Sequence, residues 1–163
     1  MNAGQQRRAS MTSPAITPAL NPFFGLLPQE LWNKAKDFFI YSVEWTELAA
    51  SETETQDIAI ESDSEFLIVA SNAVAYASAS PETAVPQKPF LVTIFDNGSG
   101  RRLMNRATHI DNFFGTGQLP GYWPFPKLIP RASTLSTTLA NLDTANAYVV
   151  KLSYLGFKIF SGY

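Results

Sequence analysis

The sequence of 163 residues contains no cysteine and only one histidine, His109. Without cysteine the chain can form no disulfide framework, no thiolate metal site and no thiol nucleophile. A zinc site needs several converging ligands, and a single histidine without cysteine argues against one. We therefore predict no metal site and no cofactor.

Charged residues are also scarce, at 16% of the chain against roughly 25% in average soluble proteins. The net charge of −2 argues against a dedicated nucleic-acid-binding protein. No run is long and apolar enough to span a bilayer, and the proline-containing segment after Arg7-Arg8 lacks the apolar core of an export signal. We expect no nucleic acid, no membrane and no export signal.

The charges that are present are unevenly spread. No Lys or Arg lies between Glu44 and Glu65, whereas the chain from Lys88 onward is mainly basic. One interpretation is that the acidic segment is simply solvated. The other is that the acidic part of one copy faces the basic part of another copy, which would guide assembly.

Alternating apolar residues predict a chain built from β-strands. Proline- and glycine-rich connections between them are typical of an antiparallel β-sandwich, and we favour a jelly roll. The predicted strands cover residues 38–48, 57–61, 66–70, 90–95, 133–140 and 147–160, with loops at 49–55 and 78–87. The strand at 66–70 has room to extend through Val74 and Tyr76. A glycine near the end of the last strand, Gly156, predicts a bulge or corner there.

Residues 1–37 read as an extended N-terminal arm, followed by the sandwich domain at 38–163. Prolines recur through the arm and disfavour helix, except that Pro28 to Asp37 predicts one short helix with proline in its first turn. A free tail would not usually expose Phe23, Phe24, Leu26 and Leu27 to water. We therefore predict that these four residues bind a partner.

The strand at 90–95 is followed by a turn at 96–100, where we expect two glycines and an Asx residue to supply positive φ angles. About thirty irregular residues follow, rich in aromatics, proline and glycine, and long loops of this kind tend to be functional. The loop either closes over its own core or docks a partner. We predict that Phe113 and Phe114 belong to the core and that the partner interface includes Tyr122, Trp123, Phe125, Arg101 and Arg102.

The sequence contains few residues or motifs of the kinds that active sites use. His109 and Asp111 could pair as a general base, but no motif marks a nucleophile beside them. The segment from Gly98 to Arg102 could bind an anion through backbone N–H groups, although it lacks the lysine and helix of a phosphate loop. We predict no catalytic residues and no enzymatic activity.

Several short motifs in the second half of the chain resemble small β-sandwich virion proteins of tailed bacteriophages. They are the turn Asn97-Gly98-Ser99-Gly100-Arg101, the step Phe114-Gly115-Thr116-Gly117 with Pro120, the segment from Pro126 to Ile129, and Gly156-Phe157-Lys158. Those proteins are head accessory subunits, either capsid decoration or cement proteins or collar and neck subunits at the portal vertex. The resemblance implies a β-sandwich fold and no catalytic residues.

The expected function is therefore that of a non-enzymatic structural protein of a tailed-phage virion, assembled in the cytoplasm of the bacterial host. Its partners would be capsid or portal and neck proteins and further copies of itself in a homo-oligomer. The alternative is a carbohydrate-binding jelly-roll module, in which Tyr122, Trp123 and Phe125 would form a sugar-stacking platform.

Overall fold

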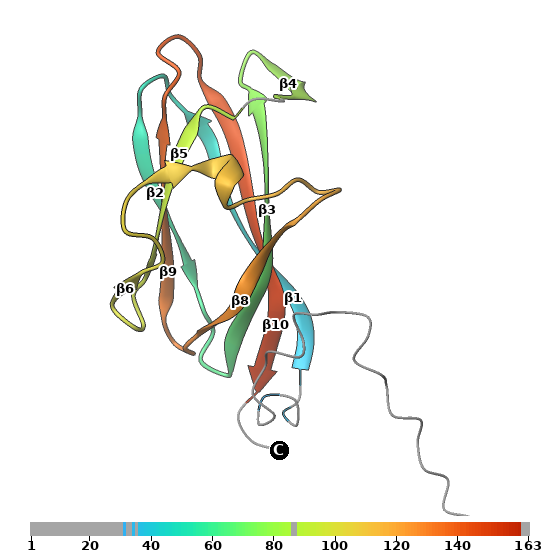
Figure 1. Ribbon diagram of the computed structural model, residues 1–163. Helices are drawn as coiled ribbons and strands as arrows, with labels where there is room; N and C mark the ends of the chain where they lie inside the picture. The colour runs from blue at the N-terminus through green and yellow to red at the C-terminus, as the bar shows by residue number, and fades with distance from the viewer. Residues whose placement is uncertain (1–30, 32–33, 35, 86–87, 161–163) are drawn as a thin grey trace, which may run out of the picture.

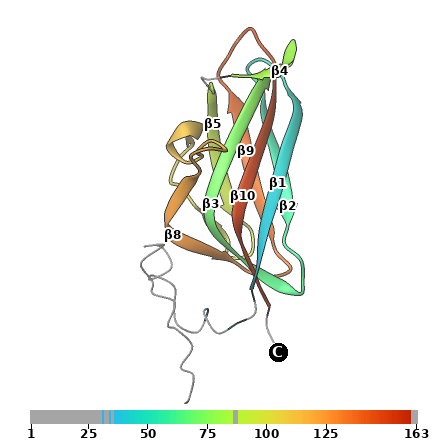
Figure 2. The same cartoon turned by 90° about the vertical axis from the view of Figure 1, so that its right-hand side faces the viewer.

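The structure, a computed structural model, describes residues 31, 34, 36–85 and 88–160, and these residues form two β-sheets (Figure 1). Sheet A has the order β1 (Lys36–Leu48), β10 (Tyr148–Phe160), β3 (Ser64–Ala77), β4 (Ser80–Ala84), and β8 (Gly121–Ile129) also pairs with β3. Sheet B has the order β2 (Thr53–Ala59), β9 (Thr134–Asn141), β5 (Phe90–Asp96), β6 (Arg101–Arg102), and β7 (Thr108–His109) also pairs with β5. The two sheets lie face to face as a sandwich (Figure 2).

The strand order is that of a jelly roll. If the short β4 is set aside and β6 and β7 count as one interrupted strand, sheet A contains the first, eighth, third and sixth strands in chain order. Sheet B contains the second, seventh, fourth and fifth. All strand pairs in both sheets are antiparallel, as double-sheet jelly rolls require. The prediction of an all-β sandwich is thus confirmed.

The core lies between the sheets and follows the period-2 alternation of the sequence. In β5 the side chains of Phe90, Val92 and Ile94 are fully buried, whereas the residues between them are half-buried on the outer face. Tyr154 of β10 is also fully buried, and its hydroxyl shares a 2.7 Å hydrogen bond with Thr137 of β9 across the core. This bond satisfies the one polar atom that the tyrosine brings into an apolar layer.

A second, smaller apolar cluster lies on the outer face of sheet A. Leu67 of β3 and Ile159 of β10 are buried there, and partly buried Leu31, Val69 and Leu128 pack against them. Because Leu31 precedes β1, the start of the described chain is held against the outside of the sandwich rather than inside it.

The bulge predicted at Gly156 is present. The register between β10 and β3 shifts between Leu155 and Gly156, where Val69 of β3 is left without a partner. A Cβ atom on Gly156 would lie 2.0 Å from the carbonyl oxygen of Leu67, so only glycine fits this close approach of two backbones.

Other local predictions differ from the structure. Lys36 and Asp37, the last two residues of the predicted helix, belong to β1, and most of that helix lies outside the described residues. The predicted loops at 49–55 and 78–87 contain the start of β2 and the whole of β4. The long irregular segment contains β6, β7, the 3-10 helix η3 (Ile110–Asn112) and the nine-residue strand β8.

Candidate docking surface

The segment from η3 to β8 is fixed to the sandwich by two phenylalanines. Phe114 is 2% exposed, and its ring lies 5.5 Å from that of Tyr154 in an edge-to-face contact. Phe113 is half-buried, with its ring 5.3 Å from that of Phe114. Phe114 therefore lies in the core, as predicted, and Phe113 is partly buried and packs against that core.

Trp123 also belongs to the core, and the prediction that it anchors a partner interface is wrong. Only 7% of its surface is exposed, and its ring lies 4.7 Å from that of Phe113. Its Nε1–H donates to Ser71 Oγ at 3.0 Å, and that hydroxyl donates to the carbonyl oxygen of Phe113 at 3.1 Å. Trp123 thus faces the core from β8 and is inaccessible to a partner.

A tight loop joins Phe114 to β8. Gly115 N–H donates to Ser71 O at 3.2 Å, and Ala73 N–H donates to Gly115 O at 2.8 Å, so the loop begins against β3. Leu119 N–H then donates to Thr116 Oγ1 at 3.0 Å, which closes the turn. Because both ends are hydrogen-bonded, the loop presents its outward side chains in a fixed arrangement.

Three large apolar or aromatic side chains point out of this anchored segment. Leu119 is 78% exposed, Tyr122 57% and Phe125 79%. Tyr122 pairs with Ala70 of β3, and Lys127 pairs with Ile68. These partners are only two positions apart on β3, whereas Tyr122 and Lys127 are five positions apart on β8, so the chain between them bulges away from β3. This bulge turns Phe125 outward. The strand accommodates its two prolines because it lies at the edge of the sheet, where a residue without an N–H donor breaks no ladder hydrogen bond.

A second exposed apolar pair was not predicted. Phe38 is 59% exposed and Ile40 is 45% exposed on the outer face of β1. The sequence signal was present, since apolar residues at 38–41 occupy both faces of the strand rather than alternating with polar ones. The alternation of Val43 and Trp45 with polar residues indicates the core face, and it places Phe38 and Ile40 on the opposite face.

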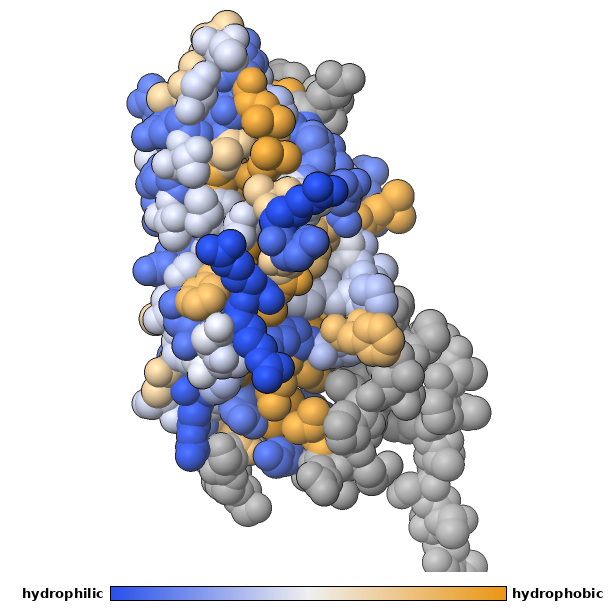
Figure 3. Space-filling view, turned by 60° about the vertical axis from the view of Figure 1, so that its left-hand side comes forward, coloured by the Kyte–Doolittle hydropathy of each residue, from blue (hydrophilic) through white to orange (hydrophobic). Residues whose placement is uncertain are grey.

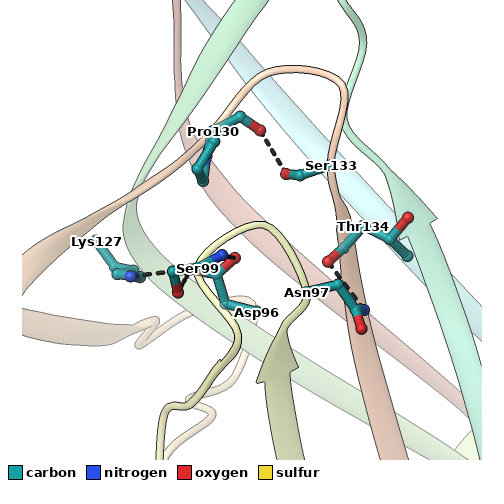
Figure 4. A network of polar contacts seen from close by, with 7 residues as sticks. All are labelled: Asp96, Asn97, Ser99, Lys127, Pro130, Ser133 and Thr134. Atoms are coloured by element: carbon teal, nitrogen blue, oxygen red, sulfur yellow. Dashed lines mark hydrogen bonds and ion pairs between the residues drawn. The ribbon is translucent and has the colours of Figure 1, made fainter.

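The turn at 96–100 is held by a buried carboxylate (Figure 4). Asp96 is fully buried and accepts hydrogen bonds from Ser99 N–H at 3.2 Å and Ser99 Oγ at 2.6 Å. Lys127 of β8 forms an ion pair with Asp96 at 2.9 Å, which ties β8 to sheet B. Burial raises the pKa of Asp96, but the Ser99 hydrogen bonds and Lys127 outweigh it, so the pKa lies below its ordinary value.

The glycines of this turn have different roles from those expected. Only Gly100 has a positive φ, at 66°. Gly98 is instead required by close packing, since a Cβ there would lie 2.7 Å from that of Ser133. Arg101 and Arg102 follow on β6 and are both exposed, so their predicted role at an interface stays a prediction.

The acidic segment is partly neutralised within the chain. Glu44 pairs with Lys151 at 3.0 Å on the outer face of sheet A, and Glu61 pairs with Lys158. In contrast, no ion pair joins Asp57 of β2 to any residue in the described part of the chain. Among the described residues, Glu44 of β1 and Glu61 of the β2–β3 connection are thus neutralised within the chain, whereas Asp57 of β2 is not.

The single histidine lies beside a half-exposed carboxylate that pairs with a buried lysine. His109 Nδ1 is 3.7 Å from Asp111 Oδ2, and Lys88 Nζ is 3.3 Å from the other oxygen of Asp111. Within residues 36–85 and 88–160, no three His, Asp or Glu side chains are grouped so that they could hold a metal ion. The described chain also has no helix long and apolar enough to cross a membrane.

The predicted interface residues therefore separate into three groups. Tyr122, Phe125 and the two arginines are exposed on the β6–β8 side of the sandwich, and Trp123 is buried. Phe23, Phe24, Leu26 and Leu27 lie outside the described residues. On the face seen in Figure 3, projecting apolar side chains are interspersed with strongly hydrophilic ones.

No protein-family model matches this sequence, and no curated protein matches it either. Among solved structures, the chain is similar to one in the crystal structure of the infectious bursal disease virus VP2 subviral particle, with a TM-score of 0.37 and 17% identity. The match covers 76% of this chain and 33% of that chain, so the chain spans about a third of its length. A likeness this weak carries no argument about function, and membership of a tailed-phage family stays a prediction.

Proposed function

We propose that this chain is a non-enzymatic structural subunit of a virus particle. More specifically, we propose a head accessory subunit of a tailed phage, bound to capsid or portal and neck proteins as a decoration, cement or collar protein. The observation that carries the proposal is the set of exposed apolar side chains, Leu119, Tyr122 and Phe125, held on a segment whose inner residues are locked in the core.

Preorganisation is what makes this surface suitable for docking. Large aromatic side chains on a fixed backbone lose little conformational entropy when a partner covers them, which is why they anchor protein interfaces. Exposed Arg101 and Arg102 on neighbouring β6 can supply a polar rim of the kind that surrounds such anchors.

The surface chemistry also favours binding over catalysis. The His109–Asp111–Lys88 group has ordinary ion-pair distances, and the side chains of both His109 and Asp111 are more than 40% exposed. The Lys88–Asp111 pair is well explained as a structural contact that joins η3 to the segment just before β5. The proposal therefore assigns the group no catalytic role.

The carbohydrate-binding alternative keeps two of its three platform residues. Tyr122 and Phe125 are exposed and could stack on a sugar ring, but Trp123 is in the core. A glycan array probed with the wild-type chain and with Phe125→Ala tests this alternative. Glycan binding that the substitution abolishes would favour the sugar-binding function over the structural one.

Binding to particles that lack the subunit tests the proposal directly. The variant Leu119→Ser/Phe125→Ser should weaken binding by at least about thirtyfold, since truncated anchor residues at interfaces typically cost about 2 kcal/mol or more. Leu142→Ser is the matched control, because Leu142 is 51% exposed but lies on the β9–β10 connection. Equal binding by both variants would contradict the proposed docking surface.

The N-terminal arm provides a separate test of the assembly role. We expect a chain without residues 1–27 to keep the folded sandwich but to lose incorporation into particles, because Phe23, Phe24, Leu26 and Leu27 would no longer bind a neighbour. Circular dichroism reports the fold, and quantitative mass spectrometry of purified particles reports incorporation. Unfolding of the truncated chain would instead place the arm in the core.

A further inference from the structure

We propose that the partner on the β6–β8 side of the sandwich is the β1–β2 side of a second copy of this chain. The inference rests on the proposed function, because it names a partner for the same docking surface. The two sides lie opposite each other across the molecule, with β8 on one flank and β1 and β2 on the other (Figure 2).

The charges on the two flanks of sheet B are of opposite sign. The β2 flank carries Glu52, Glu54 and Asp57, and the β6 flank carries Arg101, Arg102 and Arg106. In the described structure none of these six side chains forms an ion pair, although Glu52 and Glu54 accept local hydrogen bonds. Each flank thus carries the counter-charge that the other lacks.

One acidic and one basic residue of these two flanks also lie at the same height. Asp57 pairs with Ser136, Ser136 with Phe95, and Phe95 with Arg102, so Asp57 and Arg102 end one row that crosses the sheet. Directly opposite residues in antiparallel strands project from the same face. A copy displaced sideways along this row therefore brings its Asp57 toward Arg102 of its neighbour.

Sheet A shows the same relation with apolar side chains. Ile40 pairs with Leu155, Leu155 with Ala70, and Ala70 with Tyr122, so Ile40 and Tyr122 end one row on the outer face. Phe38 precedes Ile40 by two residues on β1, and Phe125 follows Tyr122 by three residues on β8. All four side chains are at least 45% exposed. Sideways contact would cover apolar surface in sheet A while it joins opposite charges in sheet B.

Strand direction permits this arrangement in both sheets. Successive strands from β1 to β8 and from β2 to β6 are antiparallel, so each sheet ends with strands that run in opposite directions. Two copies in the same orientation would then continue the antiparallel alternation across their contact. The contact is heterologous, joining unlike surfaces, so it builds a ring or an open row rather than a two-fold dimer.

Two charge-reversal variants test the inference by sedimentation velocity on the full chain at low salt. Arg101→Glu/Arg102→Glu makes both flanks acidic, and Glu54→Lys/Asp57→Lys makes both flanks basic. We expect each variant alone to associate at least about tenfold more weakly than wild type, because like charges would meet. An equal mixture should regain wild-type association, since the acidic and basic chains can alternate.

The mixture is its own control for misfolding, because it contains only the mutated chains. Wild-type association should also weaken as salt rises from about 50 to about 500 mM, since screening shortens the range of charge contacts. A wild-type chain that stays monomeric at low salt, or a mixture that fails to associate, overturns the inference.

The proposed function can fail separately from this inference. Particle binding by a wild-type chain that does not self-associate contradicts the second-copy partner and leaves the virion role standing. Self-association that the mixture restores, without any binding to particles, supports the partner and contradicts the virion role.

Discussion

At the scale of single residues, Trp123 and Phe125 show how one strand serves two purposes. They are two positions apart on β8, yet Trp123 is 7% exposed and Phe125 is 79% exposed. Trp123 contacts Phe113 and Tyr154 and donates to Ser71, whereas Phe125 projects from the bulge. The first fixes the strand, and the second is available to a partner.

This division predicts opposite effects of two alanine substitutions. Trp123→Ala should lower the free energy of unfolding by about 3–5 kcal/mol, because it leaves a large cavity in the core. Phe125→Ala should change it by less than about 0.5 kcal/mol, as expected for an exposed side chain. Urea denaturation followed by circular dichroism measures both, and equal losses would contradict the placement of Trp123.

The Asp96–Lys127 ion pair gives a second prediction at this scale. Lys127→Met should cost about 3 kcal/mol of stability, because it leaves a fully buried carboxylate without its counter-charge. Lys151→Met is the matched control: its 3.0 Å pair with Glu44 is nearly as short, but both side chains are more than 40% exposed. That substitution should cost at most about 1 kcal/mol.

The two lysine variants are compared by urea denaturation at neutral pH. The prediction fails if Lys127→Met lowers the free energy of unfolding no more than Lys151→Met does. That result would show that the buried Asp96 depends on its lysine no more than the exposed Glu44 does.

At the scale of elements, Gly156→Ala should destabilise the protein by about 1–3 kcal/mol, because the new methyl group would press on the backbone of Leu67. Gly117→Ala is the control, since a Cβ at Gly117 meets no atom within 4 Å. Thermal denaturation should show a lower melting temperature for the first variant and almost no change for the second.

The elements that can be predicted from the sequence are those whose pattern is local. Strands β1, β5, β9 and β10 alternate clearly, and the Gly156 bulge was marked by its residue type. Strand β8 is not among them, because two internal prolines argue against a central strand, whereas β8 is a bulged edge strand.

The candidate site could be predicted only in part, because some of its residues are placed by contacts with residues that are distant in sequence. Tyr122 and Phe125 are exposed, and their predicted place in a partner interface stays a prediction. Burial of Trp123 depends on Ser71 and Tyr154, which are distant in sequence and reach it only through the β3–β8 pairing. Local composition could not show those contacts.

At the scale of the whole molecule, buried and hydrogen-bonded ionisable groups set the pH range of stability. The pKa of Asp96 is lower in the folded chain than its ordinary value near 4, so its contribution is present above about pH 4 and is lost as pH falls. Burial raises the pKa of Tyr154, so its contribution is present below about pH 10 and is lost as pH rises.

We therefore expect a stability plateau between about pH 4 and pH 10 with losses on both sides. Denaturation midpoints across this range measure the profile, and Asp96→Asn should reduce the acid slope because position 96 can no longer titrate. An unchanged acid slope in that variant would show that other carboxylates dominate.

The central claim is that this sandwich is a structural part of a virus particle, and its location in the particle tests that claim most directly. Electron microscopy of the purified parent particle with this subunit labelled should show the label at regular positions on the shell or at the neck. The account predicts that the flank carrying Leu119 and Phe125 faces neighbouring density. Particles that carry no label, although the labelled chain is folded and abundant in the same preparation, would contradict it.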